Sequence, residues 1–85
     1  MSRKEKLLVR LLLRPKDFSY SELKSLLNSM GYAEFNKGKT SGSRVAFIHS
    51  KSGHPIRLHK PHPKNILKSY QVDLSIEELK KENLI

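Results

Sequence analysis

The stretch NKGKTSGSRVAFIHSKSGHPIRLHKPHPKNILKSYQV, residues 36–72, determines both the fold and the charge of this chain. It contains eight Lys and Arg residues, all four histidines and no Asp or Glu. The other residues contain nine Lys and Arg and all eight acids, so nearly all of the formal net charge of +9 lies in this window. Because the window also reads as strands and turns, we expect its charge to gather on one surface. Such a surface needs an anionic partner, and a phosphate backbone is the commonest one.

The length of 85 residues and the absence of cysteine limit the classes of protein that this chain can be. We expect one domain, residues 1–85, in which residues 1–16 form an N-terminal helical extension of a core, residues 17–85. Without cysteine there are no disulfides and no Cys-based zinc sites. The apolar run at residues 11–13 is too short for a signal peptide, and no run approaches the roughly 20 residues of a membrane span. A soluble cytoplasmic protein with no membrane partner is therefore expected.

The first predicted helix spans Lys4–Arg14 and ends before Pro15. Its leucines fall at helical spacing, with basic residues beside them. A basic amphipathic helix can bind a membrane surface or a partner protein, but six aliphatic residues in so short a span need burial. We therefore interpret this segment as a packing helix with a solvated basic edge.

The second predicted helix spans Tyr20–Met30, and its start is marked by a capping box. In this motif the side chains of Ser19 and Glu22 each bond the backbone N–H of the other residue. Gly31 follows the helix as a left-handed stop.

An antiparallel meander is predicted next, with strands at Tyr32–Phe35, Arg44–His49 and Ile56–Lys60. Side chains alternate between the two faces of a strand, so Val45, Phe47 and His49 share one face. Phe47 marks that face as the one toward the helices. The same alternation places Arg44 on the opposite face of its strand, and it separates Arg57 and His59 from the apolar side chains of theirs.

The last predicted helix lies near Leu74–Glu82, with a second capping box at Ser75 and Glu78. A start one turn earlier also fits, because Val72 falls on the same apolar stripe. Leu84 and Ile85 are expected to close the core. The predicted fold class is α+β, in the order α-α-β-β-β-α, with helices on one face of a three-stranded antiparallel sheet.

The four histidines are the residues most suited to chemistry, because imidazole exchanges protons near neutral pH. RNA cleavage through attack by the 2′-hydroxyl needs a base, an acid and a cation that stabilises the phosphorane. Histidines among Lys and Arg supply these parts without a metal or cofactor, and the spacing of these four does not match a metal site. His54, in a turn beside Pro55, is the least suited to catalysis. Each histidine can also be read as a hydrogen-bonding or gap-filling residue.

The loop KGKTSGS, residues 37–43, combines small residues with Lys37 and Lys39. Its backbone amides can approach a phosphate closely. It does not match the nucleotide-binding pattern G-x-x-x-x-G-K-[ST], so a P-loop is excluded. A plain hairpin loop is the other interpretation.

Several short motifs occur in one order along the chain: Gly42-Ser43-Arg44, Phe47 with His49, Lys60-Pro61-His62-Pro63, and a final helix ending Asn83-Leu84-Ile85. A helix that runs from Glu22-Leu23 into Gly31-Tyr32 precedes them. Over Tyr20–Ile85 this pattern resembles the HicA family of toxin ribonucleases. The order and spacing of the motifs carry the resemblance, because each motif alone is weak.

The resemblance implies a fold similar to a double-stranded-RNA-binding domain, cleavage of messenger RNA, and neutralisation by a HicB-like antitoxin. In the family a catalytic histidine follows the Gly-Ser pair, where this chain has Arg44. Arginine holds a phosphate well but is a poor proton carrier, because its pKa exceeds 12. Residues 4–14 are a second departure, since they extend beyond the shorter family core.

These observations predict an RNA-binding toxin of a type II toxin–antitoxin system that acts as a metal-independent endoribonuclease. The predicted catalytic residues are Arg44, His49, His59 and His62. The predicted RNA-binding residues are Lys37, Lys39, Arg44, Arg57, Lys60 and Lys64. Two alternatives stay open: an RNA-binding module of the same fold that does not cleave, and a basic protein whose main ligand is an acidic antitoxin.

Overall fold

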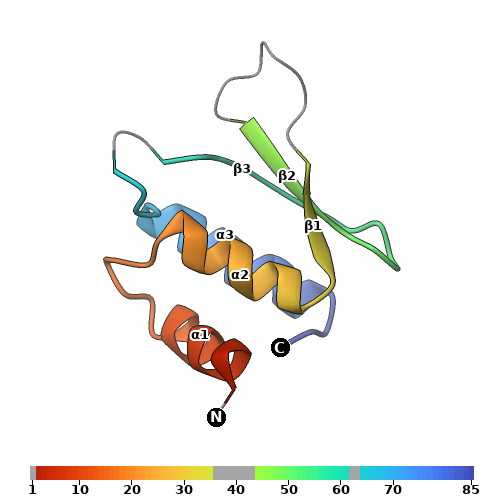
Figure 1. Cartoon of the computed structure of the whole chain (residues 1–85), viewed down its shortest axis with the longest axis horizontal. Helices are drawn as coiled ribbons and strands as arrows, with labels where there is room; N and C mark the ends of the chain where they lie inside the picture. Colours follow the sequence, from red (N-terminus) through yellow and green to blue (C-terminus); the bar gives the residue numbers. More distant parts are fainter. Residues whose placement is uncertain (1, 36–43, 62–63) are drawn as a thin grey trace.

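The computed structural model describes residues 2–35, 44–61 and 64–85. Its elements follow the predicted order, α-α-β-β-β-α (Figure 1). They are α1 (Arg3–Leu12), α2 (Tyr20–Ser29), β1 (Tyr32–Phe35), β2 (Arg44–His49), β3 (Pro55–His59) and α3 (Ser69–Lys81). Three residues of the predicted site, Lys37, Lys39 and His62, lie outside the described part of the chain.

The three strands form an antiparallel sheet in the order β1-β2-β3, as the meander predicts. Phe47 of β2 lies opposite Glu34 of β1 and Ile56 of β3, and its ring is fully buried. Because directly paired residues point to the same side, Phe47 fixes the inner face of all three strands. The prediction that Phe47 faces the helices is confirmed.

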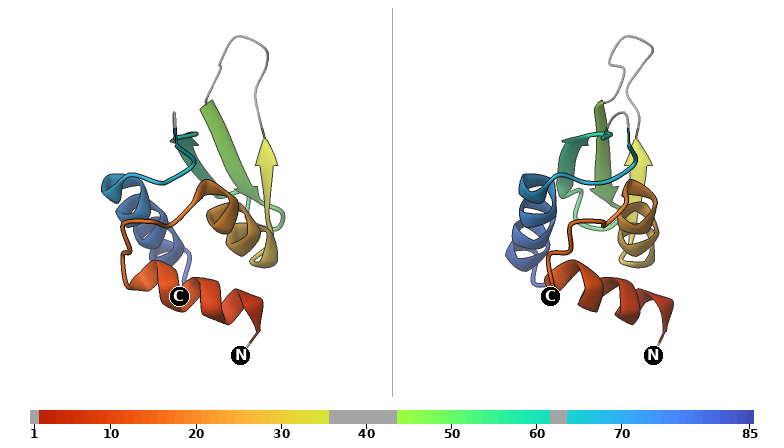
Figure 2. Two further views of the ribbon diagram at one scale, coloured as in Figure 1. Left: turned by 60° about the vertical axis from the view of Figure 1, so that its left-hand side comes forward. Right: turned by 90° about the vertical axis from the view of Figure 1, so that its left-hand side faces the viewer.

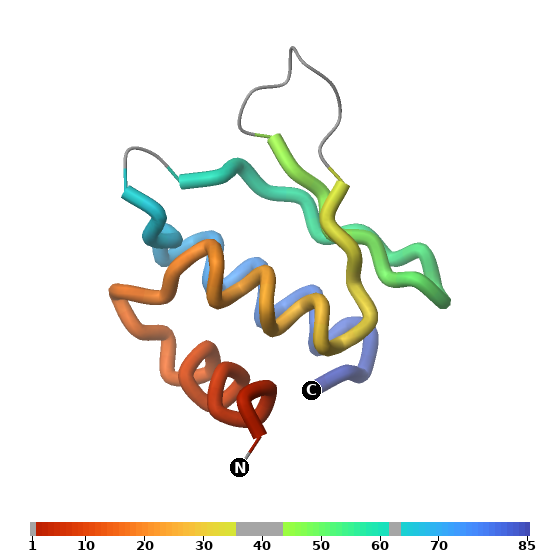
Figure 3. The backbone as a smooth tube through the Cα atoms, in the orientation of Figure 1, coloured from red at the N-terminus to blue at the C-terminus, as the bar shows by residue number. Residues whose placement is uncertain are grey.

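The helices cover this inner face in two layers (Figure 2). In the first layer α2 packs against β1 and α3 packs against β3. In the second layer α1 packs against α2 and α3 on their side away from the sheet. The buried residues come from every element and form one cluster. In the described part of the chain no helix covers the outer face of the sheet (Figure 3).

The first helix is joined firmly to the rest of the domain rather than appended to it. Leu7 and Leu11 are buried members of the core. The guanidinium of Arg10 bonds Glu22 of α2 at 2.9 Å and Asp17 at 3.0 Å, and Arg14 bonds Asp73 of α3 at 2.7 Å. Exposed ion pairs contribute little stability, so burial of the two leucines is the main attachment.

The predicted start of α2 is confirmed. The hydroxyl of Ser19 accepts from the backbone N–H of Glu22 at 3.0 Å, and the Glu22 carboxylate accepts from the N–H of Ser19 at 2.9 Å. Gly31 follows with φ of +96°, the left-handed conformation that favours glycine. A capping box that the sequence analysis did not predict, formed by Ser2 and Glu5, starts α1.

The start of α3 predicted near Leu74 is wrong, whereas the alternative start one turn earlier is close to the observed one. The helix begins at Ser69, where the N–H of Lys68 donates to the side-chain oxygen of Gln71 at 3.0 Å. Ser75 is inside the helix and fully buried, and its hydroxyl donates to the carbonyl of Gln71 at 2.9 Å. A serine that bonds the preceding turn gives the same sequence pattern as a cap.

The two C-terminal residues behave differently from each other. Ile85 packs against the core as predicted, but Leu84 is exposed.

α1 and α2 each end slightly earlier than predicted, at Leu12 and Ser29. Such differences are the fraying expected at helix ends.

The capping geometry predicts opposite outcomes for two serines. Ser19→Ala should lower the free energy of unfolding by roughly 0.5–2 kcal/mol, because it leaves a helix-start N–H without its partner. Ser75→Ala should change it by less than about 0.5 kcal/mol, because the Gln71 carbonyl keeps its helical bond and alanine favours the helix. Urea denaturation of both variants measures the difference. A larger loss at Ser75 than at Ser19 would contradict the placement of both helix starts.

Candidate nucleic-acid interface

The outer face of the sheet, hereafter the open face, carries cations without acids. Strand register places eight side chains on it: Ala33, Phe35, Arg44, Ala46, Ile48, Pro55, Arg57 and His59. The two arginines and the histidine are exposed. The one acid in the strands, Glu34, points to the inner side because it lies opposite Phe47. The open face therefore offers positive charge and hydrogen-bond donors to an anionic ligand.

Arg44 and His59 lie directly opposite each other across β2 and β3. Directly opposed residues in an antiparallel pair have Cβ atoms about 4.5–5.5 Å apart. A guanidinium and an imidazole at that separation can contact the same phosphate group. The structure thus brings together two residues of the predicted catalytic set that are 15 positions apart in the sequence.

A second row crosses the sheet beside this pair. Ala46 of β2 lies opposite Arg57 of β3 on one side and Phe35 of β1 on the other. Arg57 is therefore on the same face as Arg44, one pair further along the strands. Among the residues that the structure describes, neither arginine takes part in an ion pair. Both charges are available to an external ligand.

Two other predicted RNA-binding residues lie away from the open face. The ammonium group of Lys60 is 5.6 Å from the centre of the Tyr20 ring, on the side of the sheet where α2 lies. Lys64 is exposed beside Asn65, whose carbonyl accepts from the N–H of Tyr20 at 3.0 Å. Neither cation belongs to the face that Arg44 and Arg57 share.

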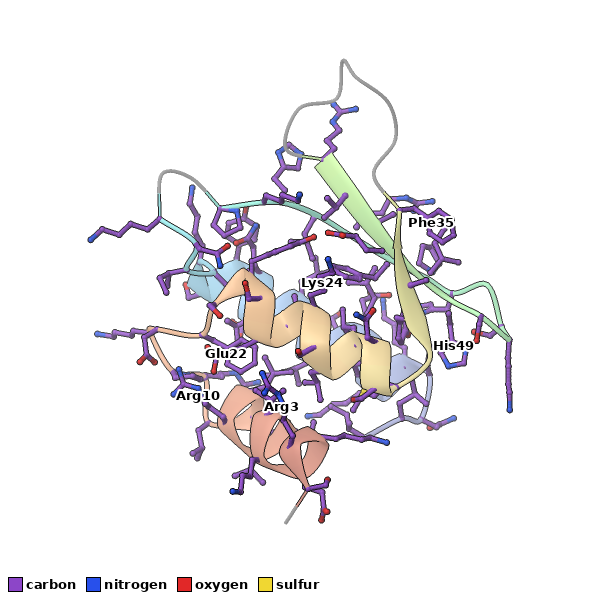
Figure 4. The ribbon with its side chains drawn as sticks, in the orientation of Figure 1. Arg3, Arg10, Glu22, Lys24, Phe35 and His49 are labelled. Carbon is purple, nitrogen blue, oxygen red and sulfur yellow. The ribbon has the colours of Figure 1, made fainter. Side chains whose placement is uncertain are left out.

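His49 is not brought to this group. It lies at the opposite end of β2 from Arg44, and its pairing with Tyr32 places it on the inner side (Figure 4). Its ring packs edge-on against Tyr32, with ring centres 5.0 Å apart, and its Nδ1 accepts from the N–H of Lys51 at 3.2 Å. A Cβ atom at Gly31 would lie 3.0 Å from its Nε2. This imidazole serves the turn and the end of α2.

His54 is held in a network of its own. Its Nε2 is 2.8 Å from a carboxylate oxygen of Glu78, and its Nδ1 is 2.8 Å from the Tyr32 hydroxyl. Because a carboxylate can only accept, Nε2 donates the proton of this bond, while Nδ1 and the Tyr32 hydroxyl share the second hydrogen bond. The network joins the β2–β3 turn to α3.

A further polar cluster, which the sequence analysis did not predict, joins α2 to β1. The hydroxyl of Tyr20 donates to Glu34, and the ammonium of Lys24 lies 3.2 Å from the same carboxylate. The bond from Tyr20 lowers the pKa of Glu34, while burial raises the pKa of the Tyr20 phenol. These two contacts offset the charge of Glu34, the one acid in the strands. Alternation along β1 puts Glu34 on the same side as Tyr32, and a carboxylate on a buried side needs a partner, which is the signal that the sequence offers.

Comparisons of the chain with protein-family models, with curated proteins and with solved structures found no match. The resemblance to the HicA family therefore stays a prediction that rests on the motifs.

Residues 2–35, 44–61 and 64–85 contain no group of three or more His, Asp or Glu side chains that could hold a metal ion. In the same residues no helix has the length and apolar character needed to cross a membrane.

The network of His54 predicts how stability depends on pH. The hydrogen bond from His54 is the main cause that lowers the pKa of Glu78 below its ordinary value. A carboxyl with a lowered pKa stabilises the fold above its unfolded pKa of about 4.3, and this stability is lost as pH falls through the folded pKa. Glu78→Gln should therefore lower the melting temperature at pH 7, and the difference from wild type should shrink below about pH 4.

Glu77→Gln is the matched control for this prediction. Glu77 is one residue away and largely exposed, and among the described residues it pairs only with Lys81, at 3.8 Å. Its substitution should leave the melting temperature almost unchanged at both pH values, because exposed pairs contribute little. Equal effects of the two substitutions would contradict a structural role of the His54–Glu78 bond.

Proposed function

We propose that this protein binds RNA on the open face and cleaves it as an endoribonuclease toxin of the HicA type. The observation that carries the proposal is the direct pairing of Arg44 with His59 on a face without acids. The basic window of the sequence supports it, because it contributes both residues. So does the resemblance of the motifs over Tyr20–Ile85.

The chemistry follows from the two side chains. Arg44 binds two oxygens of the scissile phosphate with its planar guanidinium and stabilises the charge that develops on them. The 2′-oxygen bonds to phosphorus while the bond to the 5′-oxygen breaks. A base takes the proton from the 2′-hydroxyl and an acid gives one to the 5′-oxygen, leaving a 2′,3′-cyclic phosphate. His59 performs one of these two proton transfers. His62 remains the predicted carrier of the other.

The arginine at the place of the family's histidine favours a second candidate function. Arg44 cannot exchange protons at neutral pH, so a protein with this residue can retain RNA binding without cleavage. In that case the open face is the same binding surface, and His59 only donates hydrogen bonds. The two candidates differ in one observable, the breakage of RNA by the purified protein.

The proposed setting is the cytoplasm, with a HicB-like antitoxin as the protein partner. An acidic antitoxin would satisfy the same cations that bind a phosphate backbone. The alternative in which the antitoxin is the only tight ligand predicts no salt-dependent affinity for RNA. Measurement of RNA affinity at several salt concentrations therefore separates it from both RNA-binding candidates.

A cleavage assay with four variants tests the proposal. Long RNA is incubated with purified protein, with and without EDTA, and the rate of chain breakage is measured. His59→Ala should slow cleavage about 10²–10⁴-fold, the usual contribution of a proton carrier, with little change in RNA affinity. Arg44→Ala should weaken both binding and cleavage. Arg44→Lys should lose less affinity and less cleavage than Arg44→Ala, because lysine keeps the positive charge but cannot donate two parallel hydrogen bonds to the phosphate.

Arg3→Ala is the control that removes the same charge elsewhere. Arg3 is exposed on α1, far from the sheet (Figure 4). It should leave cleavage unchanged and alter affinity only slightly. Salt-dependent RNA binding without cleavage would leave the binding module as the function. Cleavage that survives both His59→Ala and Arg44→Ala would overturn the assignment of the site.

A further inference from the structure

We infer that Phe35 stacks on an unpaired base and makes the open face selective for single-stranded RNA. This inference rests on the proposed function, because it needs RNA to bind that face. It adds a residue and a substrate class. Phe35 belongs to neither the predicted catalytic set nor the predicted RNA-binding set.

The exposure of Phe35 is the first observation. Its side chain is 51% exposed, whereas Phe18 and Phe47 are fully buried. Its register opposite Ala46 places it on the open face, and it lies at the end of β1 directed away from α2 (Figure 4). Burial of a phenylalanine contributes about 1.5–3 kcal/mol, so an exposed ring on a strand forgoes much of that stabilisation. An aromatic ligand such as a base restores it.

The neighbours of Phe35 leave room for a flat ligand. Ala46 lies opposite it, and Ala33 is the next residue of β1 on the same face. Both side chains are small, so the ring of Phe35 protrudes from the surface around it. Beyond Ala46 lies Arg57, two strands and roughly 10 Å away. A base stacked on Phe35 would therefore have cations beside it for its phosphates.

The ring selects single strands because of the geometry of the duplex. In a helix of RNA each base is already stacked between its neighbours, so only its edges are accessible. An unpaired base offers a free π-face, and aromatic side chains use such faces with little preference for sequence. The arrangement of Phe35, Arg57 and Arg44 along one face thus fits a single strand that runs across the sheet. The face carries no acid that would repel its backbone.

The absence of tryptophan from the chain provides a direct probe. Phe35→Trp introduces a sole tryptophan at the proposed stacking position. Its fluorescence should be quenched when a single-stranded RNA oligonucleotide binds, and far less by the same oligonucleotide with abasic sites or by a duplex. Tyr70→Trp is the control, because Tyr70 is 61% exposed on α3 and outside the sheet. Its fluorescence should not respond to the RNA.

Affinity measurements complete the test. Phe35→Ala should weaken binding of single-stranded RNA about 5- to 150-fold, the usual contribution of one stacked base, and should change binding of a duplex little. Phe35→Tyr should bind as wild type, because the ring is kept. Phe35→Leu keeps apolar bulk without a π-face and should behave like Phe35→Ala. Circular dichroism and melting temperature check that each variant is folded.

The outcomes separate this inference from the proposed function. If Arg44→Ala weakens RNA binding while Phe35→Ala, Phe35→Leu and the tryptophan probe show no effect, the open face binds RNA and the stacking role is wrong. Equal losses for single-stranded and duplex RNA on Phe35→Ala also overturn the selectivity. If no RNA binds at any salt concentration, both proposals fall. Quenching at position 35 together with a loss confined to single strands supports the inference.

Discussion

The burial of one face of the sheet, centred on Phe47, is the constraint on which the rest of the structure depends. The Phe47 ring is fully buried and lies 5.9 Å from the ring of Tyr20 on α2. Because side chains alternate along a strand, this single orientation turns Arg44 and Arg57 outward. A slip of one residue would bring guanidinium groups into the core, where the cost of removing them from water is several kcal/mol for each charge. The same burial that stabilises the fold thus displays the charge.

Much of the fold could be predicted because its signals are local. The strands Tyr32–Phe35 and Arg44–His49 and the capping box of Ser19 and Glu22 agree with the sequence analysis. The sequence left the start of α3 between two positions, because Ser75 and Glu78 have the spacing of a capping box while Val72 fits an earlier start. Only the packing of α3 decides the matter, since it buries Gln71 and Val72 and so extends the helix toward Ser69.

The sequence predicts which residues of the candidate site share a face of the sheet. It does not predict which of them lie opposite each other on neighbouring strands. Alternation alone separates Arg44 from His49 and groups Arg57 with His59. That His59 is the partner of Arg44 depends on the register of β2 and β3, which the turn and the packing of Ile56 set. The sequence does not predict that Phe35 is exposed, because a phenylalanine at the end of a strand usually belongs to the core. A tertiary arrangement was needed to show that this face has no cover in the described residues.

The position of α1 against α3 has a consequence for how the chain is made. Of the three helices, the one made first packs on the one made last, and the ion pair between Arg14, just after α1, and Asp73 of α3 joins residues 59 positions apart. Until α3 emerges, the apolar side of α1 can be covered only by α2. A nascent chain of this kind exposes leucines that attract chaperones or other unfinished chains. The arrival of α3 then completes the cover of α1.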